Sequence, residues 1–502
     1  MKTNVKRITA IALTAALVLS ISMISACNEE QQQEVLEFDS HEAVVERAGE
    51  LAKESSEVYD AFPDVEVTQK VRWMSWYPMD EKSPAAEVFR ARYGVPAPKN
   101  ENDDTIIERI PVVYAQRYER LALAVSGDTS PDMFQFEDRF YPWGVHQNIF
   151  RTIDGVIDLE HEIWDKTRDV IELFKWGGKN YAPVTQLANS SGLLFYRRST
   201  MSINGFDDPE ELWRKNQWTW TKFEEQLESF SDPQNKKWGV MGFYIDEATI
   251  ATTGTPLIGI VDGKLQHNMD HGNIERATTF MQRLADNDWR HPYHTETNNT
   301  LDKQALRARN ILFWNDGPWE YQETLQKQIT AENRNRGFVG EDGKTIYFDD
   351  DVREEIFNDI GIVPWPRDPN STVHYQRGKQ DAMMLVSGAQ NINGYKAWVT
   401  SMAIAAQDER MDEVGRDKLK RDYNWTELQL NTLDEILEMP VIFDFKNGIG
   451  EDVSDATRDS NVENLTKPII TEGDSYTQRR DAERNVIITR INLMNERVDQ
   501  QS

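Results

Sequence analysis

An alternation of strand-like and helix-like segments is the feature that most limits how this chain can fold. In the first part of the chain, hydrophobic periodicity predicts elements at 67–73 (strand), 105–113 (strand), 117–125 (helix) and 131–136 (strand). The order returns at 192–196 (strand), 222–230 (helix), 238–244 (strand), 274–285 (helix) and 311–314 (strand). Such alternation is typical of α/β domains with a largely parallel sheet. The sequence therefore predicts two α/β units, and we find no internal repeat.

A helical pattern precedes the first unit. In residues 41–60, Val44, Ala48 and Leu51 recur at helical spacing, which predicts a peripheral helix. The preceding residues 28–40 are polar and predict a tether.

The N-terminus predicts export. Three basic residues are followed by an apolar run from Ile8 to Ile24, which is shorter than a membrane span and ends in small residues. The step Ile24-Ser25-Ala26-Cys27 resembles a lipobox, where bacterial lipoproteins are cut before a lipid-modified cysteine. We therefore expect residues 1–26 to be a signal peptide and Cys27 to anchor the protein on the extracytoplasmic face of the cell membrane. The alternative is an ordinary signal peptide followed by a chance cysteine.

The composition disfavours some classes of partner. Removing residues 1–26 takes away three of the 56 basic residues and none of the 85 acidic ones, which leaves a net charge of −32. Such a surface repels nucleic acid and anionic lipid. Because Cys27 is the only cysteine, disulfides within the chain are impossible and stability must come from a hydrophobic core. Many of the 15 Trp residues lie in polar stretches, which favours carbohydrate binding because flat rings pack on the apolar faces of sugars.

Short motifs occur in a defined order along the chain. They are Ser126–Phe134, with Gly-Asp and Pro-Asp-Met-Phe, Glu137–Phe140 (Glu-Asp-Arg-Phe), Gly178–Pro183 (Gly-Lys-Asn-Tyr-Ala-Pro), Leu194–Arg198, Thr219–Glu224, Asn315–Trp319 and Ile360–Pro366. Together, over roughly residues 65–410, they resemble the family 1 extracellular solute-binding proteins of ABC sugar importers, which are maltose-binding-protein-like. Two motifs depart from the family pattern: Arg197-Arg198 replaces Asn-Lys, and Asn315–Trp319 has one extra residue. Thr221 and Glu224 also have capping-box spacing, which predicts a helix start.

The resemblance implies a two-lobe periplasmic-binding-protein-like fold of type II, in the α/β class, with the ligand in a cleft between lobes joined by crossing strands. It implies a first lobe over 65–184 and 363–412, after a tether and helix over 27–64. It implies a second lobe over 187–358 and 413–502, with crossings near Ala182–Gln186 and Ile360–Trp365. The expected protein is a monomer without a cofactor, which passes an oligosaccharide to ABC permease subunits in the membrane.

Candidate ligand-binding residues follow from the same resemblance and from strand positions. Asp138 and Arg139 match the family's cleft pair, and Trp319 matches its stacking tryptophan in the second lobe. Trp76 and Tyr77 follow the first strand, where α/β folds place ligand contacts. Asp138 and Arg139 could instead form a surface ion pair, and Trp319 could be a core tryptophan. Trp76 and Tyr77 could instead cover the edge of the first sheet.

Residues at the first crossing and other tryptophans complete the set. Gln186, Asn189 and Ser190 offer amide and hydroxyl groups suited to sugars, or form a polar hinge loop. Trp314, Asp316, Trp365 and Trp143 are further candidates, for which packing is slightly favoured over binding.

Two other functions stay open. An anchored, acidic, Trp-rich protein could be a glycoside hydrolase or lyase, although no zinc-protease, serine-hydrolase or phosphate-loop motif occurs. The same fold could also bind a peptide or another non-sugar solute. The spacings His267-x-x-x-His271 and His291-x-x-His294 lack a third metal ligand, and Asp232–Lys236 lacks the acidic residues of a calcium loop, so we expect neither metal.

Overall fold

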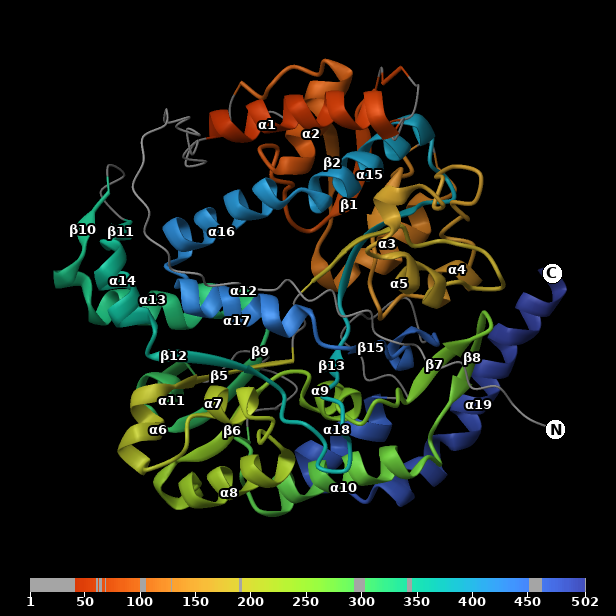
Figure 1. The fold of residues 1–502 in the computed structure, drawn as a ribbon. Helices are drawn as coiled ribbons and strands as arrows, with labels where there is room; N and C mark the ends of the chain where they lie inside the picture. The colour runs from red at the N-terminus through yellow and green to blue at the C-terminus, as the bar shows by residue number, and fades with distance from the viewer. Residues whose placement is uncertain are drawn as a thin grey trace, which may run out of the picture. The chain divides into compact units, whose positions relative to one another are not determined.

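The computed structural model describes residues 41–59, 62, 66–67, 69–99, 105–127, 129–188, 192–292, 303–340, 345–450 and 463–501 (Figure 1). Cys27, the predicted signal peptide and the tether lie outside the described residues, as do Asn189 and Ser190. Within the described ranges, every helix is too short or too polar to cross a lipid bilayer.

The first sheet has the strand order β2-β1-β3-β14-β4. Its strands are β1 (Val71–Ser75), β2 (Ile107–Pro111), β3 (Met133–Gln135), β4 (Val184–Leu187) and β14 (Gln380–Leu385). Strand β1 pairs in parallel with β2 and β3, so that Trp73 lies between Arg109 and Met133. Strand β14 is antiparallel to both β3 and β4. The predicted parallel arrangement is therefore interrupted by one reversed strand, which arrives from a distant part of the chain.

Helices cover this sheet and extend its core. They are α2 (Pro84–Tyr93), α3 (Arg117–Ala124), α4 (Trp143–His146), α5 (Arg168–Leu173) and α15 (Ile392–Gln407). Helix α2 begins after Ser83, whose hydroxyl accepts from Ala86 N, and ends at Gly94 in the left-handed conformation, where glycine is favoured. Asp132 of the Pro-Asp motif is fully buried and accepts from the backbone N–H groups of Arg72, Gln390 and Asn391, so it joins β1 to the start of α15.

The predicted N-terminal helix is confirmed and packs on the first lobe. Helix α1 (His41–Glu54) contacts α2 and α15, and its buried face consists of Val44, Ala48, Leu51 and Ala52. Arg47 also forms an ion pair of 2.6 Å with Asp408, which ties α1 to α16 (Glu409–Tyr423).

The second sheet has the strand order β12-β5-β9-β6. Its strands are β5 (Leu193–Arg197), β6 (Trp238–Gly242), β9 (Ile311–Asp316) and β12 (Ile360–Pro364). Strand β5 runs antiparallel to β12 and β9, whereas β6 and β9 are parallel. The second sheet therefore also contains one reversed strand, and β5 and β9 are buried on both faces.

Two helices of this lobe lie close to their predicted positions. Helix α10 (Gly272–Asp286) buries Ile274, Phe280 and Leu284. Helix α8 (Trp220–Phe230) has Thr219 as its N-cap, whose hydroxyl accepts from Lys222 N. The predicted capping by Thr221 is wrong, because Trp220 N already bonds to Arg367 O and the helix starts two residues earlier.

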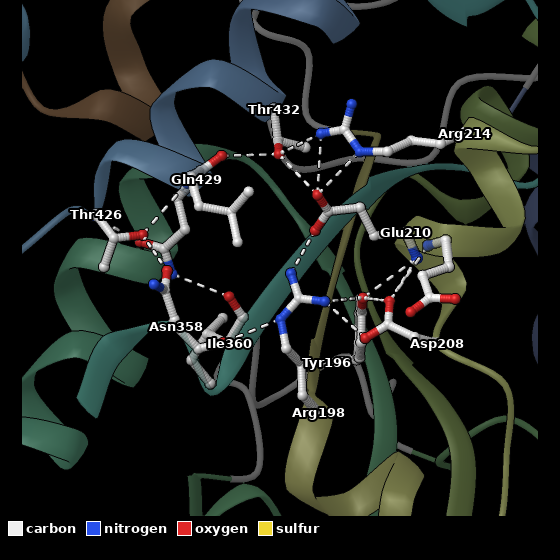
Figure 2. Close-up of polar contacts among 12 residues, drawn as sticks. Tyr196, Arg198, Asp208, Glu210, Arg214, Asn358, Ile360, Thr426, Gln429 and Thr432 are labelled. Carbon is white, nitrogen blue, oxygen red and sulfur yellow. Dashed lines mark hydrogen bonds and ion pairs between the residues drawn. The ribbon is translucent and has the colours of Figure 1, made fainter. Parts of the chain in front are cut away.

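Figure 2 shows a polar network that fixes α17 (Glu427–Leu437) to the second sheet. Arg198, the residue that departs from the family pattern, binds Asp208 at 2.6 Å and forms a further ion pair with Glu210. Thr432 Oγ1 donates to Glu210, and Gln429 donates to the carbonyl group of Ile360 (Figure 2). Gln429 also donates to the carbonyl group of Phe357. The guanidinium of Arg198 thus binds two carboxylates, and through Glu210 this network joins α6 (Arg198–Asn204) and α7 (Pro209–Arg214) to α17.

Smaller elements complete both lobes. They are α6 (Arg198–Asn204), α7 (Pro209–Arg214), α9 (Ile245–Ala251), α11 (Lys303–Arg307), α12 (Pro318–Glu320), α13 (Gln326–Glu332), α14 (Asp350–Phe357), α18 (Glu463–Glu472), α19 (Tyr476–Gln501), β7 (Ile258–Val261), β8 (Lys264–His267), β10 (Phe338–Val339), β11 (Ile346–Tyr347), β13 (Gln376–Arg377) and β15 (Val441–Ile442).

The chain passes between the sheets after β4 and after β12. All of Ile360–Pro364 pairs with β5, so the second crossing follows Pro364, later than the sequence places it, and passes through β13 before reaching β14. Strand β13 pairs with β15, which brings the segment after α17 back to the crossing. The C-terminal helix α19 contacts α4 of the first lobe and β8 of the second.

Candidate ligand-binding cleft

A cleft of about 680 Å³ opens where the strand ends of both sheets meet the crossing segment. Its walls are Trp76, Tyr77, Tyr114, Gln135–Arg139, Phe174, Tyr244, Trp319, Arg377–Gln380 and Phe443–Phe445. Trp76 follows β1, Tyr114 follows β2, and Gln135 is the last residue of β3. In the second sheet, Tyr244 follows β6 and Trp319 follows β9. These are the carboxyl ends of parallel strands, where open α/β sheets bind their ligands.

Aromatic side chains line the first-lobe wall. The rings of Trp76 and Tyr77 meet edge to face at 5.4 Å, and Trp76 meets Tyr114 at 5.1 Å. Tyr77 Oη donates to Gln135 Oε1 at 2.5 Å. Behind them, the fully buried Arg117 lies 3.7 Å from the Tyr114 ring centroid and 5.3 Å from that of Trp76. Its guanidinium also binds both oxygens of Glu137, so one cation positions a ring and a carboxylate of the wall.

An ion-pair chain connects the two lobes across the cleft. Arg377 of the crossing segment binds Asp138 of the first lobe at 2.6 Å and Glu247 of α9 at 2.7 Å. Burial disfavours the guanidinium charge, but Glu247 and Asp138 together raise the pKa of Arg377 above its ordinary value. The guanidinium also lies 5.1 Å from the Tyr244 ring. These ion pairs position the Asp138 carboxylate and the Arg377 guanidinium beside the space where a ligand would lie.

The indole ring of Trp319 lies close to the backbone of Gly317, two residues earlier in the chain. Trp319 is 38% exposed, and a Cβ added at Gly317 would lie 2.2 Å from its ring atoms. Only glycine therefore fits beneath the ring at that position, which explains the Gly-Pro-Trp sequence. The ammonium of Lys379 lies 4.3 Å from the ring centroid.

The floor of the cleft comes from the segment after β15. Phe443 and Phe445 pack against Phe174 with ring centroids 4.9 and 5.5 Å away. Between them, Asp444 accepts from the backbone N–H groups of Leu257 and Ile258, and burial raises the pKa of its carboxyl to about 6. This segment therefore contacts both lobes beneath the ligand space.

The structure brings together Trp76, Tyr77, Asp138, Arg139 and Trp319 in the cleft wall. Trp314 and Trp365 are 1% and 2% exposed and lie in hydrophobic cores, because they pack against Phe195 and Phe223. Asp316 is buried and accepts from Gly317 N at 2.7 Å, so it shapes the turn before Trp319. Gln186 donates to Asp381 at 2.7 Å, and the half-buried Trp143 stacks on His146; both lie outside the wall.

Sequence reasoning missed several residues of the wall. Tyr114 and Tyr244 follow β2 and β6, so the strand-end rule that selected Trp76 could have found them. Arg377, Lys379 and the Phe443–Phe445 segment had no such signal, because they reach the cleft through long-range pairing of β13, β14 and β15.

Metal ligands do not gather in the described part of the chain: no group of three or more His, Cys, Asp or Glu side chains there could hold an ion. His271 Nδ1 instead accepts from Asn273 N and caps α10. Asp232 accepts from Asn235 in a local turn.

Two α/β lobes, two chain crossings and an aromatic cleft at the strand ends define a two-lobe solute-binding fold of type II. Comparison with solved structures shows the same fold in sugar-binding ABC substrate-binding proteins.

Three of these structures illustrate the match. The sugar-binding protein MalE from Xanthomonas citri is 14% identical, with a TM-score of 0.56 over 86% of this chain and 100% of its own. The GacH receptor of Streptomyces glaucescens, solved unliganded and with acarbose, is 14% identical, with a TM-score of 0.54 over 85% and 99%. A family 1 extracellular solute-binding protein from Bifidobacterium longum subsp. infantis is 15% identical, with a TM-score of 0.52 over 83% and 97%. By sequence alone, no family profile and no curated protein matches this chain.

Proposed function

We propose that this protein is the substrate-binding component of an ABC importer. It captures a carbohydrate, specifically an oligosaccharide, and delivers it to permease subunits in the membrane. The observation that carries the proposal is the cleft itself, where aromatic rings from both lobes face polar forks at the strand ends. Rings such as Trp76 and Trp319 can pack on the apolar faces of sugars, and paired groups such as Asp138 and Arg377 can replace water on hydroxyls. MalE and GacH, which share the fold, are a sugar-binding protein and a receptor solved with acarbose.

Binding without chemical conversion fits the state of the cleft carboxylates. Glu137 is held by Arg117, and Asp138 is held by Arg377. The third wall carboxylate, Asp444, is held by the backbone N–H groups of Leu257 and Ile258, so all three are fixed in an arrangement that suits binding. The neighbours that share the fold are binding proteins.

The first test is a thermal-shift screen of residues 28–502 against oligosaccharides. Ligand that binds only the folded state raises Tm, and it should be recovered unchanged. Trp319→Ala should weaken binding of that ligand by about 1–3 kcal/mol, because the stacking surface is lost. Trp213→Ala, which removes a ring outside the cleft wall, serves as the matched control and should leave the affinity unchanged.

Two outcomes would count against this function. Formation of a cleaved product would make the protein an enzyme, and a Tm shift with peptides but with no glycan would indicate a non-sugar solute. An unchanged affinity in folded Trp319→Ala protein would remove this ring from the binding site.

We also propose that the protein is anchored through lipid on Cys27, since the lipobox-like step precedes this residue. Cys27→Ser should move the protein from the membrane fraction to the medium, because the acyl chains that hold it have no attachment point. Fractionation with labelled palmitate measures this. Membrane retention of the serine variant would contradict the anchor.

A further inference from the structure

Lys379 differs from Arg117 and Arg377 of the cleft because, within the described residues, its ammonium forms no direct ion pair. Within the described residues, no carboxylate forms an ion pair or hydrogen bond with its ammonium, which lies 4.3 Å from the centroid of the Trp319 ring. Burial lowers the pKa of Lys379 below its ordinary value, although the nearby carboxylates of Asp381, Asp138 and Asp316 oppose this effect. A partly desolvated cation without an anionic partner is unfavourable in the free protein.

The carboxylates near Lys379 have other partners. Asp138 pairs with Arg377 at 2.6 Å, and Asp381 accepts from Gln186 at 2.7 Å. Asp316 accepts from the adjacent Gly317 N at 2.7 Å. Their interactions leave the ammonium available to a group that enters the cleft from outside.

The position of Lys379 is fixed by the fold. It lies between β13 and β14, and its carbonyl accepts from Ala188 N at 3.0 Å, which extends the β4–β14 pairing. The second lobe supplies Trp319 beside it. A sugar stacked near Trp319 would therefore bring its ring substituents within reach of the ammonium.

We infer that the oligosaccharide taken by this cleft is acidic, and that an anionic substituent on it pairs with Lys379 beside Trp319. This inference rests on the proposed sugar-binding function. The shared chemistry is a carboxylate, as in a uronic acid, or a sulfate ester. The net charge of −32 that remains after residues 1–26 are removed does not prevent such binding, because charges farther than about 8 Å are largely screened at physiological salt.

The test compares each acidic oligosaccharide with its neutral partner by calorimetry. Oligogalacturonide is paired with its methyl ester, and a sulfated galacto-oligosaccharide with its desulfated form, so the two arms separate carboxylate from sulfate. One acidic form should bind roughly 30-fold more tightly than its neutral partner, as expected for a charge pair away from bulk water. This ratio should fall as salt is raised.

Substitutions assign the effect to Lys379. In Lys379→Met the ratio should fall to about one, whereas Lys379→Arg should retain most of it. Lys53→Met, on the exposed face of α1, is the matched control and should keep the full ratio. Without ligand, Lys379→Met should melt no lower than the wild type, because it removes a partly desolvated charge that has no direct ion pair. A lower Tm would show a structural role and overturn the inference.

The inference and the proposed function can fail separately. Neutral forms that bind as tightly as acidic ones in both arms would overturn the acidic ligand and leave carbohydrate binding intact. A full ratio in Lys379→Met would also overturn it. No binding by any glycan of the panel would remove the carbohydrate function and this inference together.

Discussion

Replacement of Arg377 by methionine is expected to destabilise the protein by about 3–5 kcal/mol, because it leaves Glu247 buried without its cation. Glu247 is only 8% exposed, and its ion pair with Arg377 spans 2.7 Å. The same substitution frees Asp138, so the first lobe loses its link through the crossing segment. Denaturant unfolding measures the change, and ligand affinity should fall with it.

Two further variants show whether the charge chain causes this loss. In Arg377→Met/Glu247→Gln, removal of the orphaned charge should recover part of the stability, which gives a coupling energy from the double-mutant cycle. Arg283→Met breaks the more exposed ion pair with Glu224 and should change stability by less than about 1 kcal/mol. If Arg377→Met and Arg283→Met lowered the free energy of unfolding equally, the ion pairs of Arg377 would contribute no more to stability than an exposed ion pair.

Arg117→Met is expected to cost about 3–5 kcal/mol for the same reason and also to disorganise the first-lobe wall. Arg117 is fully buried, donates to Glu137 at 2.8 and 2.6 Å, and donates to Tyr114 O at 2.7 Å. Without it, the Glu137 carboxylate keeps the hydrogen bond from Tyr118 Oη but loses its cation, and the Tyr114 ring loses its cation as well. Denaturant unfolding gives the stability, and calorimetry with the ligand found in the thermal-shift screen gives the binding.

The variant Arg117→Lys tests whether the positive charge or the planar shape of the guanidinium is required. Arg117→Lys keeps the positive charge but lacks the planar fork that reaches both oxygens of Glu137, so it should recover only a fraction of the loss. Full recovery by lysine would mean that charge alone matters. A loss below about 1 kcal/mol in Arg117→Met would contradict the supporting role of this residue.

Local patterns predicted most of the regular elements. The pattern at 274–285 corresponds to α10, and the pattern at 41–60 corresponds to α1 followed by a short helical extension to Tyr59. These patterns succeed because the spacing of apolar residues reflects which face of a helix or strand is buried. Combined with the strand-end rule and the family resemblance, they also select Trp76, Asp138 and Trp319, which share one cleft.

The same patterns fail where burial lies on both faces. Every residue of β9 is buried, so its sequence cannot tell whether Trp314 faces the ligand or the helices. The structure places this ring against Phe195, on the core side. Trp319, only five residues later, reaches the cleft because Gly317 allows its ring to approach the backbone.

The sequence by itself determined the α/β class, the positions of many elements and the aromatic candidates at strand ends, because these depend on neighbours within a few residues. Tertiary structure alone decided the reversed strands β5 and β14 and the partners of the cleft charges. Asp138 and Arg377 are 239 positions apart in the chain, and Asp444 meets Leu257 across 187. Local periodicity cannot predict such contacts, because they depend on how the crossing segments bring distant strands together.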